Sequence, residues 1–263
     1  DSMETYFKAK SNLFRSPLLK AGNARAIVNI DDEWGALLAN DLKQKCWTCS
    51  LDKDCRNTRK IDLFYTDLQI SSDGCMGRLH TPAGSGNFFS PLVGEFNLMN
   101  TLQGIGILVQ QGLPLNELLD AIGKFPGVPG RMQRINIPGY TSKDGHPIVL
   151  VDYAHTPDGL KNALIASRSF TKGKLICVFG CGGDRDRGKR SKMGEIAFKF
   201  SDYIVLTSDN PRQEDPQRII KDIQVGIGYS ANLLIEQDRA IAIQFAISKA
   251  SKGDVVLIAG KGH

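Results

Sequence analysis

Short apolar runs in the second half of the chain are separated by longer segments with helical signals. We predict strands at the apolar runs Val149–Val151, Leu175–Phe179, Tyr203–Thr207, Leu233–Ile235 and Val255–Ala259. We predict helices between them, at Pro157–Ser169, Lys192–Phe200, Asp215–Val225 and Arg239–Ala250. Thr156 can cap the first of these helices, with Pro157 at its first position. Alternating strands and helices are typical of βαβ units, so the pattern predicts an α/β fold with a doubly wound parallel sheet.

The first half of the chain has a less regular pattern. The elements predicted there are a helix at Glu4–Leu19, a strand at Ala26–Ile30, antiparallel strands within residues 60–81, and helices at Asn97–Gln111 and Pro114–Lys124. Asp31-Asp32-Glu33 can open a further helix, because acids are favoured at a helix N-terminus. The segment Pro126–Gly130 has the composition of a stiff linker. We therefore divide the chain into residues 1–128 and 129–263.

Polar motifs follow four of the predicted strands in the second half. The four loops are Asp152–His155, Gly180–Arg185, Ser208–Arg212 and Gly260–His263. In doubly wound sheets, ligands bind outside the carboxyl ends of the strands. We therefore expect these four loops to converge on one edge of the sheet and to form one site.

The glycine-rich loop after the second strand does not match a dinucleotide fingerprint. That pattern needs a glycine where Arg185 stands. The loop can be a plain tight turn, or a turn that lets backbone approach a ligand while Arg185 binds a carboxylate. We favour the ligand-binding turn, because Arg187, Lys189, Arg190 and Lys192 follow at once. These cations predict a loop that grips a small anion.

The other candidate residues each have a structural alternative. Asn210-Pro211 is a common turn, but Asp209, Asn210 and Arg212 together suit a zwitterion, and the residues alone leave both open. His155 can be structural or exposed at the sheet edge, and Asp152 can accept a hydrogen bond from a ribose hydroxyl. Two amides in the helix that begins at Asn97 can cap it or read a base edge; these are Asn97 and Asn100.

Composition and charge restrict the class of protein. The hydrophobic share is 41% and the charged share 23%, which excludes a disordered chain. A net charge of +5 without a clustered basic stripe argues against a nucleic-acid partner. Cys46 and Cys49 have the spacing of a zinc knuckle but lack a second ligand pair, so free thiols in a reducing compartment are the better interpretation. Without an apolar run of about 20 residues or a signal peptide, we expect a cytoplasmic protein with no membrane partner.

Both ends of the sequence lead us to expect a piece of a longer protein. The chain begins at Asp1 rather than at a methionine, and it ends on a glycine-rich loop directly after a strand.

Six sequence features, taken together and in this order, resemble the Mur ligase family. They are Met3-Glu4 with Tyr6–Lys10, Gly94–Asn97 with Asn100, Gly130–Met132, Asp152–Pro157, Gly180–Arg190, and Asp209–Arg212 followed by Ala259–His263. The Asp-Asn-Pro-Arg stretch is most similar to that of members that add meso-diaminopimelate. The resemblance covers the whole chain.

The resemblance implies a domain organisation and roles for individual residues. Residues 1–128 would be the C-terminal part of a central ATP-binding domain, and residues 129–263 a Rossmann-like amino-acid-binding domain, called the glutamate ligase domain. Lys10 would become carbamylated, help hold Mg²⁺, and act in catalysis together with His155. The nucleotide contacts would be Asn97, Asn100, Arg131, Asp152 and His155. The diaminopimelate contacts would be Arg185, Asp209, Asn210, Arg212 and Gly260.

The activity that the resemblance implies is ATP-dependent amide-bond formation in peptidoglycan precursor synthesis. Its substrates would be UDP-MurNAc-L-Ala-D-Glu and meso-diaminopimelate, and we expect a monomer. The sequence holds no G-x-x-x-x-G-K-[ST] phosphate loop, so we expect the piece to be inactive by itself. The alternatives are a lysine-adding or glutamate-adding relative and a non-catalytic amino-acid-binding module.

Overall fold

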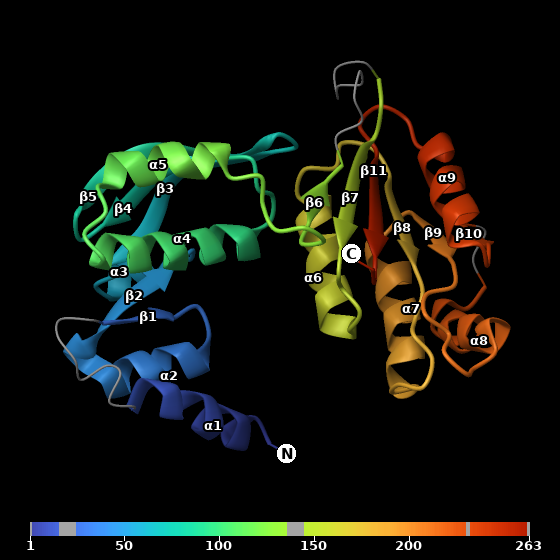
Figure 1. Cartoon of the computed structure of the whole chain (residues 1–263), viewed down its shortest axis with the longest axis horizontal. Coiled ribbons are helices and arrows are strands. Elements are labelled where there is room, and N and C mark those ends of the chain that lie inside the picture. Colours follow the sequence, from blue (N-terminus) through green and yellow to red (C-terminus); the bar gives the residue numbers. More distant parts are fainter. Residues whose placement is uncertain (1, 16–24, 136–144, 230–231, 262–263) are drawn as a thin grey trace. The chain divides into compact units, whose positions relative to one another are not determined.

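The chain divides into two compact units, shown in the computed structural model of Figure 1, which describes residues 2–15, 25–135, 145–229 and 232–261. Unit 1 comprises Asp1–Pro91 and Glu95–Phe125, and unit 2 comprises Leu92–Gly94 and Pro126–His263. The division of the chain at residue 128 into two functional domains stays a prediction.

Unit 1 is built on a five-stranded sheet with the order β1-β2-β3-β4-β5. The strands are β1 (Ala26–Asn29), β2 (Cys46–Ser50), β3 (Leu63–Ser71), β4 (Gly74–Thr81) and β5 (Gly84–Ser90). Neighbouring strands from β1 to β3 pair in parallel, and those from β3 to β5 pair antiparallel, as predicted around the turn at Gly74. The helices are α1 (Met3–Arg15), α2 (Glu33–Leu42), η2 (Lys43–Lys45), α3 (Cys55–Thr58), α4 (Glu95–Gln110) and α5 (Leu115–Lys124).

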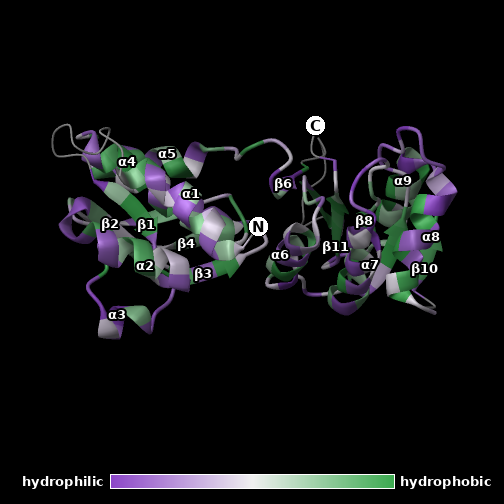
Figure 2. Cartoon of the chain, turned by 90° about the horizontal axis from the view of Figure 1, so that it is seen from below, coloured by the Kyte–Doolittle hydropathy of each residue, from purple (hydrophilic) through white to green (hydrophobic). Residues whose placement is uncertain are grey.

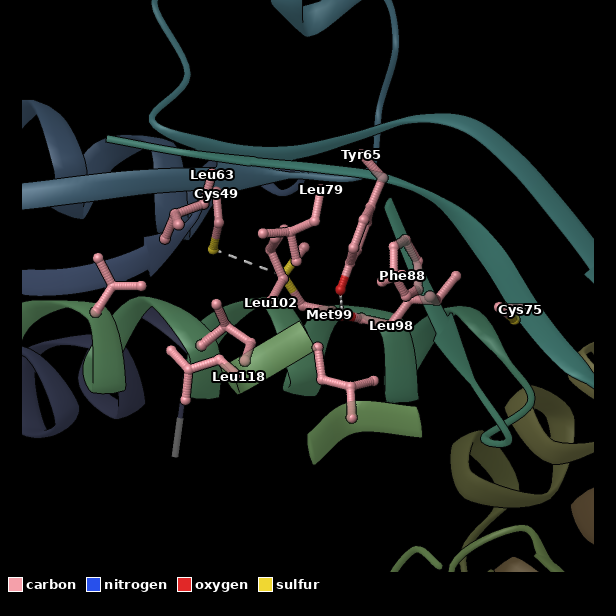
Figure 3. Close-up of a cluster of buried hydrophobic side chains, with 13 residues drawn as sticks. Cys49, Leu63, Tyr65, Cys75, Leu79, Phe88, Leu98, Met99, Leu102 and Leu118 are labelled. Atoms are coloured by element: carbon pink, nitrogen blue, oxygen red, sulfur yellow. Dashed lines mark hydrogen bonds between the residues drawn. The ribbon is translucent and has the colours of Figure 1, made fainter. Parts of the chain in front are cut away.

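The main core of unit 1 lies between the sheet and helices α4 and α5 (Figure 3). Leu63 and Leu79 from the sheet pack there against Leu102 of α4, and all three side chains are fully buried. The Tyr65 hydroxyl reaches across the core and donates to the carbonyl oxygen of Leu98 at 3.2 Å. A buried hydroxyl with a partner avoids the desolvation cost of an unpaired polar group, so this bond fixes α4 against β3.

The two cysteines with zinc-knuckle spacing lie on β2, a strand that we did not predict. Residues an odd number of positions apart point to opposite faces of a strand. Accordingly, Cys49 packs into the core under α4, and Cys46 packs into a second cluster with residues of β1 and α2. The two thiols therefore cannot ligate one ion together, and all six cysteines of the chain are free.

Unit 2 is built on a six-stranded sheet with the order β10-β9-β8-β11-β7-β6 (Figure 1). The strands are β6 (Gln133–Arg134), β7 (Ile148–Asp152), β8 (Leu175–Phe179), β9 (Tyr203–Leu206), β10 (Leu233–Ile235) and β11 (Val255–Ala259). All pairs are parallel except β6 with β7. The helices are α6 (Pro157–Arg168), α7 (Gly188–Phe200), α8 (Pro216–Ile227) and α9 (Arg239–Lys249). The predicted α/β fold with a doubly wound sheet is confirmed.

The central strands of this sheet are buried on both faces. Every residue of β8 and β11 is buried, and β11 is coloured as hydrophobic in Figure 2. Strands covered on both sides are near-continuous apolar runs, which is why the sequence located them within one residue. Thr156 caps α6 through its hydroxyl, as predicted. We missed three strands: β6 has only two residues, β2 contains two cysteines, and β5 contains two glycines.

None of the helices formed by the described residues combines the length and apolar composition that a bilayer crossing requires.

Candidate functional site

The carboxyl ends of four strands in unit 2 meet around Gly260. The φ of Gly260 is 100°, and a Cβ placed on it would lie 3.6 Å from Oδ2 of Asp209, 3.7 Å from the carbonyl oxygen of Gly180 and 3.9 Å from that of Ala154. The Gly260 amide also donates to the carbonyl oxygen of Asp152 at 3.0 Å. The loops after β7, β8, β9 and β11 therefore converge on one edge of the sheet, as the sequence predicted.

Asp152 ends β7 and is buried. Its Oδ2 accepts from the amide of Met132 at 2.8 Å, and its Oδ1 accepts from the amide of Ala154 at 2.8 Å. The carboxylate thus holds the segment before β6 against the end of β7. Each oxygen keeps a second lone pair, and a contact to a ribose stays a prediction. Arg131, next to this segment, is exposed, with its guanidinium 5.4 Å from the Tyr153 ring centre.

His155 is exposed at the sheet edge, as predicted. Its Nδ1 lies 3.0 Å from the carbonyl oxygen of Tyr153. A carbonyl only accepts, so Nδ1 carries the proton and, in the neutral ring, Nε2 is the acceptor. The His155 carbonyl oxygen accepts from Nζ of Lys189 at 2.8 Å, which ties the first loop to α7.

The glycines after β8 are needed because two loops pack directly against each other. A Cβ on Gly180 would lie 2.2 Å from the carbonyl oxygen of Thr207, and one on Gly183 would lie 1.9 Å from that of Pro211. Neither distance is compatible with a side chain. We predicted a turn that lets backbone approach a ligand; the structure shows that the backbone approaches the β9–α8 loop.

Arg212 also joins these two loops. Its Nη1 donates to the carbonyl oxygen of Gly183 at 2.5 Å, and the Gly183 amide donates to the carbonyl oxygen of Asn210 at 2.8 Å. The Arg212 side chain is exposed, and a guanidinium has five N–H donors, so it keeps donors for a ligand carboxylate. Asp209 is half-buried beside Gly260, and Arg185 is exposed on the neighbouring loop.

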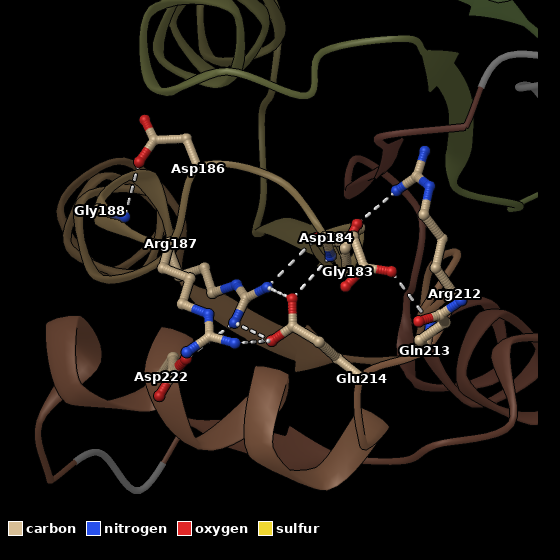
Figure 4. Close-up of polar contacts among 11 residues, drawn as sticks. Gly183, Asp184, Asp186, Arg187, Gly188, Arg212, Gln213, Glu214 and Asp222 are labelled. Carbon is tan, nitrogen blue, oxygen red and sulfur yellow. Dashed lines mark hydrogen bonds and ion pairs between the residues drawn. The ribbon is translucent and has the colours of Figure 1, made fainter.

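The prediction of a loop that grips an anion is wrong for the later cations of the run, which lie in a helix. Helix α7 begins at Gly188 rather than at Lys192, so Arg190 lies inside the helix and is fully buried. Its guanidinium is paired with Glu214 at 2.8 Å and Asp222 at 2.9 Å (Figure 4). A buried charge has to be paired in this way. The Asp186 carboxylate accepts from the Gly188 amide at 2.8 Å, and this Asx turn is the local signal for the earlier helix start.

Arg239, at the start of α9, lies beneath the same edge and was not a candidate from the sequence. Its Nη2 donates to the carbonyl oxygen of Ala259 at 3.0 Å, while Nη1 is buried and has no hydrogen-bond partner in the described part of the chain. Burial lowers the pKa of Arg239, and the nearby Asp209 carboxylate opposes that shift. The floor of the site therefore carries a cation next to Asp209.

The candidates in unit 1 form a separate set. Lys10 is exposed on α1, with Nζ 5.5 Å from the Tyr6 ring centre. Asn97 is buried in the first turn of α4, and Asn100 is exposed three residues later. Mg²⁺ prefers several oxygen ligands, and among the described residues no group of three or more acidic, histidine or cysteine side chains could hold a metal. Lys10 would need carbamylation and further ligands to help hold Mg²⁺.

Two family models match the chain. The Mur ligase middle domain matches residues 1–108, and the Mur ligase glutamate ligase domain matches residues 130–262.

Relatives that share one enzyme name extend this result. A UDP-N-acetylmuramoyl-L-alanyl-D-glutamate–2,6-diaminopimelate ligase of Prochlorococcus marinus (strain NATL1A) is 68% identical over all of this chain and over 52% of its own length. The enzyme of that name from Thermosynechococcus vestitus is 49% identical over 99% of this chain and 50% of its own length. The chain thus spans about half the length of the curated relatives that it matches.

Solved structures agree in fold. A structure of a ligase of the same name is 37% identical, has a TM-score of 0.67, and is matched over 100% of this chain and 52% of its own. A pseudomurein peptide ligase type C from Methanothermus fervidus has a TM-score of 0.69 at 16% identity, over 99% of this chain and 57% of its own, and shares the fold alone. With the two domain models matched in order along its length, the chain belongs to the Mur ligase family.

Proposed function

We propose that this chain carries the amino-acid-binding domain, and part of the ATP-binding domain, of a ligase that adds meso-diaminopimelate to UDP-MurNAc-L-Ala-D-Glu. The observation that carries the proposal is the loop edge around Gly260, where Asp209 and the two exposed arginines Arg185 and Arg212 lie on neighbouring loops. The names and identities of the relatives support the choice of amino acid.

The charges at this edge match a zwitterion. Arginine binds a carboxylate through two parallel hydrogen bonds, which suits Arg212 and Arg185 to the carboxylates of meso-diaminopimelate. The carboxylate of Asp209 and the side-chain oxygen of Asn210 can accept from an ammonium group. Gly260 leaves space between them, because any side chain there would project toward Asp209.

The reaction would proceed through an acyl phosphate. ATP would transfer its γ-phosphoryl group to the γ-carboxylate of D-Glu and leave ADP. The amine of meso-diaminopimelate would then attack the acyl carbon, form the amide, and release phosphate and a proton. Positioning and charge neutralisation do most of the work in phosphoryl transfer, and Mg²⁺ would supply part of that neutralisation when bound.

The remaining residues would serve the nucleotide. We assign the adenine side to Asn97 and Asn100, and the ribose and phosphate side to Arg131, Asp152 and His155. Lys10, once carbamylated, would change from a cation to an anion and could assist a metal. A cytoplasmic, monomeric ligase is part of the same proposal.

Calorimetric titration of the chain with meso-diaminopimelate, L-lysine and D-glutamate tests the proposal. We expect selective heat with meso-diaminopimelate, abolished by Arg212→Ala and retained in Arg218→Ala, since Arg218 is an exposed arginine on α8. A preference for lysine or glutamate would replace the substrate within the family. No heat with any of the three would contradict amino-acid binding by this chain.

A further inference from the structure

Glu214 follows the Asp209–Arg212 motif and is the most highly bonded carboxylate near the site (Figure 4). Its two oxygens accept from the Arg190 guanidinium, with Oε2 at 3.0 Å from Nη1 and Oε1 at 2.8 Å from Nη2. Oε1 also accepts from the amide of Asp184 at 2.6 Å, and Arg187 lies 3.3 Å from Oε2. The side chain is only 9% exposed. One carboxylate therefore joins the β8–α7 loop, helix α7 and the β9–α8 loop.

The two residues on either side of this joint have unusual backbone conformations. Asp184 has a φ of 49° and Arg212 a φ of 51°. Non-glycine residues in this region are strained and persist only where the surroundings hold them. The surroundings here are bonds between and within the two loops. The amide of Gln213 donates to Oδ2 of Asp184 at 3.2 Å across the two loops, and the amide of Glu214 donates to the carbonyl oxygen of Pro211 at 3.0 Å within the β9–α8 loop.

Two acids pair with the buried Arg190, and among the described residues only one of them, Glu214, also accepts from the backbone of the β8–α7 loop. Asp222 lies on α8, its side chain is 38% exposed, and its carboxylate accepts from Arg190 at 2.9 Å. Glu214 has the same partner and, in addition, the Asp184 amide. Comparing the two acids thus separates two effects. Both neutralise the buried Arg190, but only Glu214 also holds Asp184 in its strained conformation.

We propose that Glu214 is a positioning residue for the amino-acid site: anchored by the buried Arg190, its carboxylate holds Asp184 and so sets the geometry of Arg185 and Arg212 on the two clamped loops. The inference rests on the proposed function, because it assigns those two arginines to the diaminopimelate. The carboxylate of Glu214 is nearly buried and engaged by these contacts, so we assign it a positioning role and not a contact with the substrate.

The negative charge of Glu214 is the property that the clamp needs. Hydrogen bonds to a charged group are roughly twice as strong as neutral ones. Glu214→Gln keeps the size of the side chain but leaves one of its two terminal atoms an N–H donor facing guanidinium donors. With its oxygen at the Oε1 position the amide can still accept from Asp184 and from Nη2 of Arg190, but both bonds weaken without the charge. Its NH₂ group then faces Nη1 of Arg190 and the guanidinium of Arg187, where Oε2 accepted before.

The test compares Glu214→Gln with Asp222→Asn in the full chain. Both variants remove one acid from Arg190, and both are expected to lower the melting temperature. We expect only Glu214→Gln to raise the Kd for meso-diaminopimelate, by about tenfold (about 1.4 kcal/mol), with Asp222→Asn within about twofold (about 0.4 kcal/mol). Hydrogen exchange of residues 182–185 and 210–214 gives a second readout without ligand, and it should quicken in Glu214→Gln alone.

Each outcome decides a separate point. Equal weakening of binding in both variants, or unchanged binding and exchange in Glu214→Gln, would overturn the positioning role. If the unaltered chain takes up no meso-diaminopimelate, the proposed function fails, and unchanged exchange in Glu214→Gln would then separately refute the clamp. If Glu214→Gln does not fold, Glu214→Asp replaces it: the shorter acid keeps the charge beside Arg190 but withdraws from Asp184, and unweakened binding would again contradict the proposal.

Discussion

Replacing Gly194 by alanine should destabilise unit 2, although alanine is the better helix former. Gly194 lies in the middle of α7, where it faces helix α8. A Cβ on it would lie 2.2 Å from the carbonyl oxygen of Ile223, a backbone atom of α8 that cannot rotate away. A carbon and an oxygen normally approach to about 3.3 Å, so the two helices would have to separate by about 1.1 Å.

The magnitude follows from two opposing effects. Overpacking a tight contact costs about 1–3 kcal/mol, and the backbone clash places this case near the upper end. Alanine regains about 1 kcal/mol of helix propensity over glycine. We therefore expect a net loss of about 2 kcal/mol, which lowers the melting temperature of a unit of this size by roughly 6–8 °C.

Gly104→Ala is the matched control. Gly104 also lies inside a helix, α4 of unit 1, but a Cβ there would meet nothing within 4 Å. The same substitution should stabilise unit 1 by about 1 kcal/mol. Both tryptophans of the chain, Trp34 and Trp47, belong to unit 1. Tryptophan fluorescence during thermal unfolding therefore reports on unit 1. Circular dichroism reports on both units, and the part of its unfolding curve that fluorescence does not follow reports on unit 2. A Gly194→Ala variant as stable as the original chain would refute the reasoning about the helix contact.

Three further predictions follow from single groups. Hydrogen bonds from Arg190 and from the amide of Asp184 lower the pKa of Glu214 from 4.5 to about 2, so its stabilising effect is complete above the unfolded pKa and is lost as pH falls through about 2; acid-unfolding curves of Glu214→Gln should lack this dependence. Burial raises the pKa of Cys177 to about 12, so alkylation of the native chain, followed by mass spectrometry, should modify the half-buried Cys55 well before it. Tyr65→Phe should cost about 1 kcal/mol in urea unfolding followed by fluorescence, and an unchanged midpoint would contradict the role of its hydroxyl.

The parallel sheet of unit 2 and the convergence of its loops could be predicted from the sequence, because both depend on local patterns. Fully buried strands such as Val255–Ala259 are apolar throughout, and the carboxyl ends of parallel strands share one edge. The position of Gly260 beside Asp209 depends in addition on the strand order, which the sequence pattern does not give.

The ion network around Arg190 could not be predicted in the same way. An arginine among other cations gives no sign that it is fully buried, and its partner Glu214 lies 24 residues away on another loop. The strand Gly84–Ser90 was missed for a different reason: its glycines weaken the alternating pattern. A contact between distant segments decided the first case, and pairing with the neighbouring strand β4 decided the second.

The glycines at positions 180 and 183 limit how this binding edge can evolve. Each lies so close to the neighbouring loop that any side chain would push the two loops apart. Mutations in these two loops that retain the fold are therefore confined to other positions, such as Arg185, Asn210 and Arg212. A few substitutions at those exposed positions could therefore change which amino acid the site binds. The packing of the two loops would stay the same during such a change.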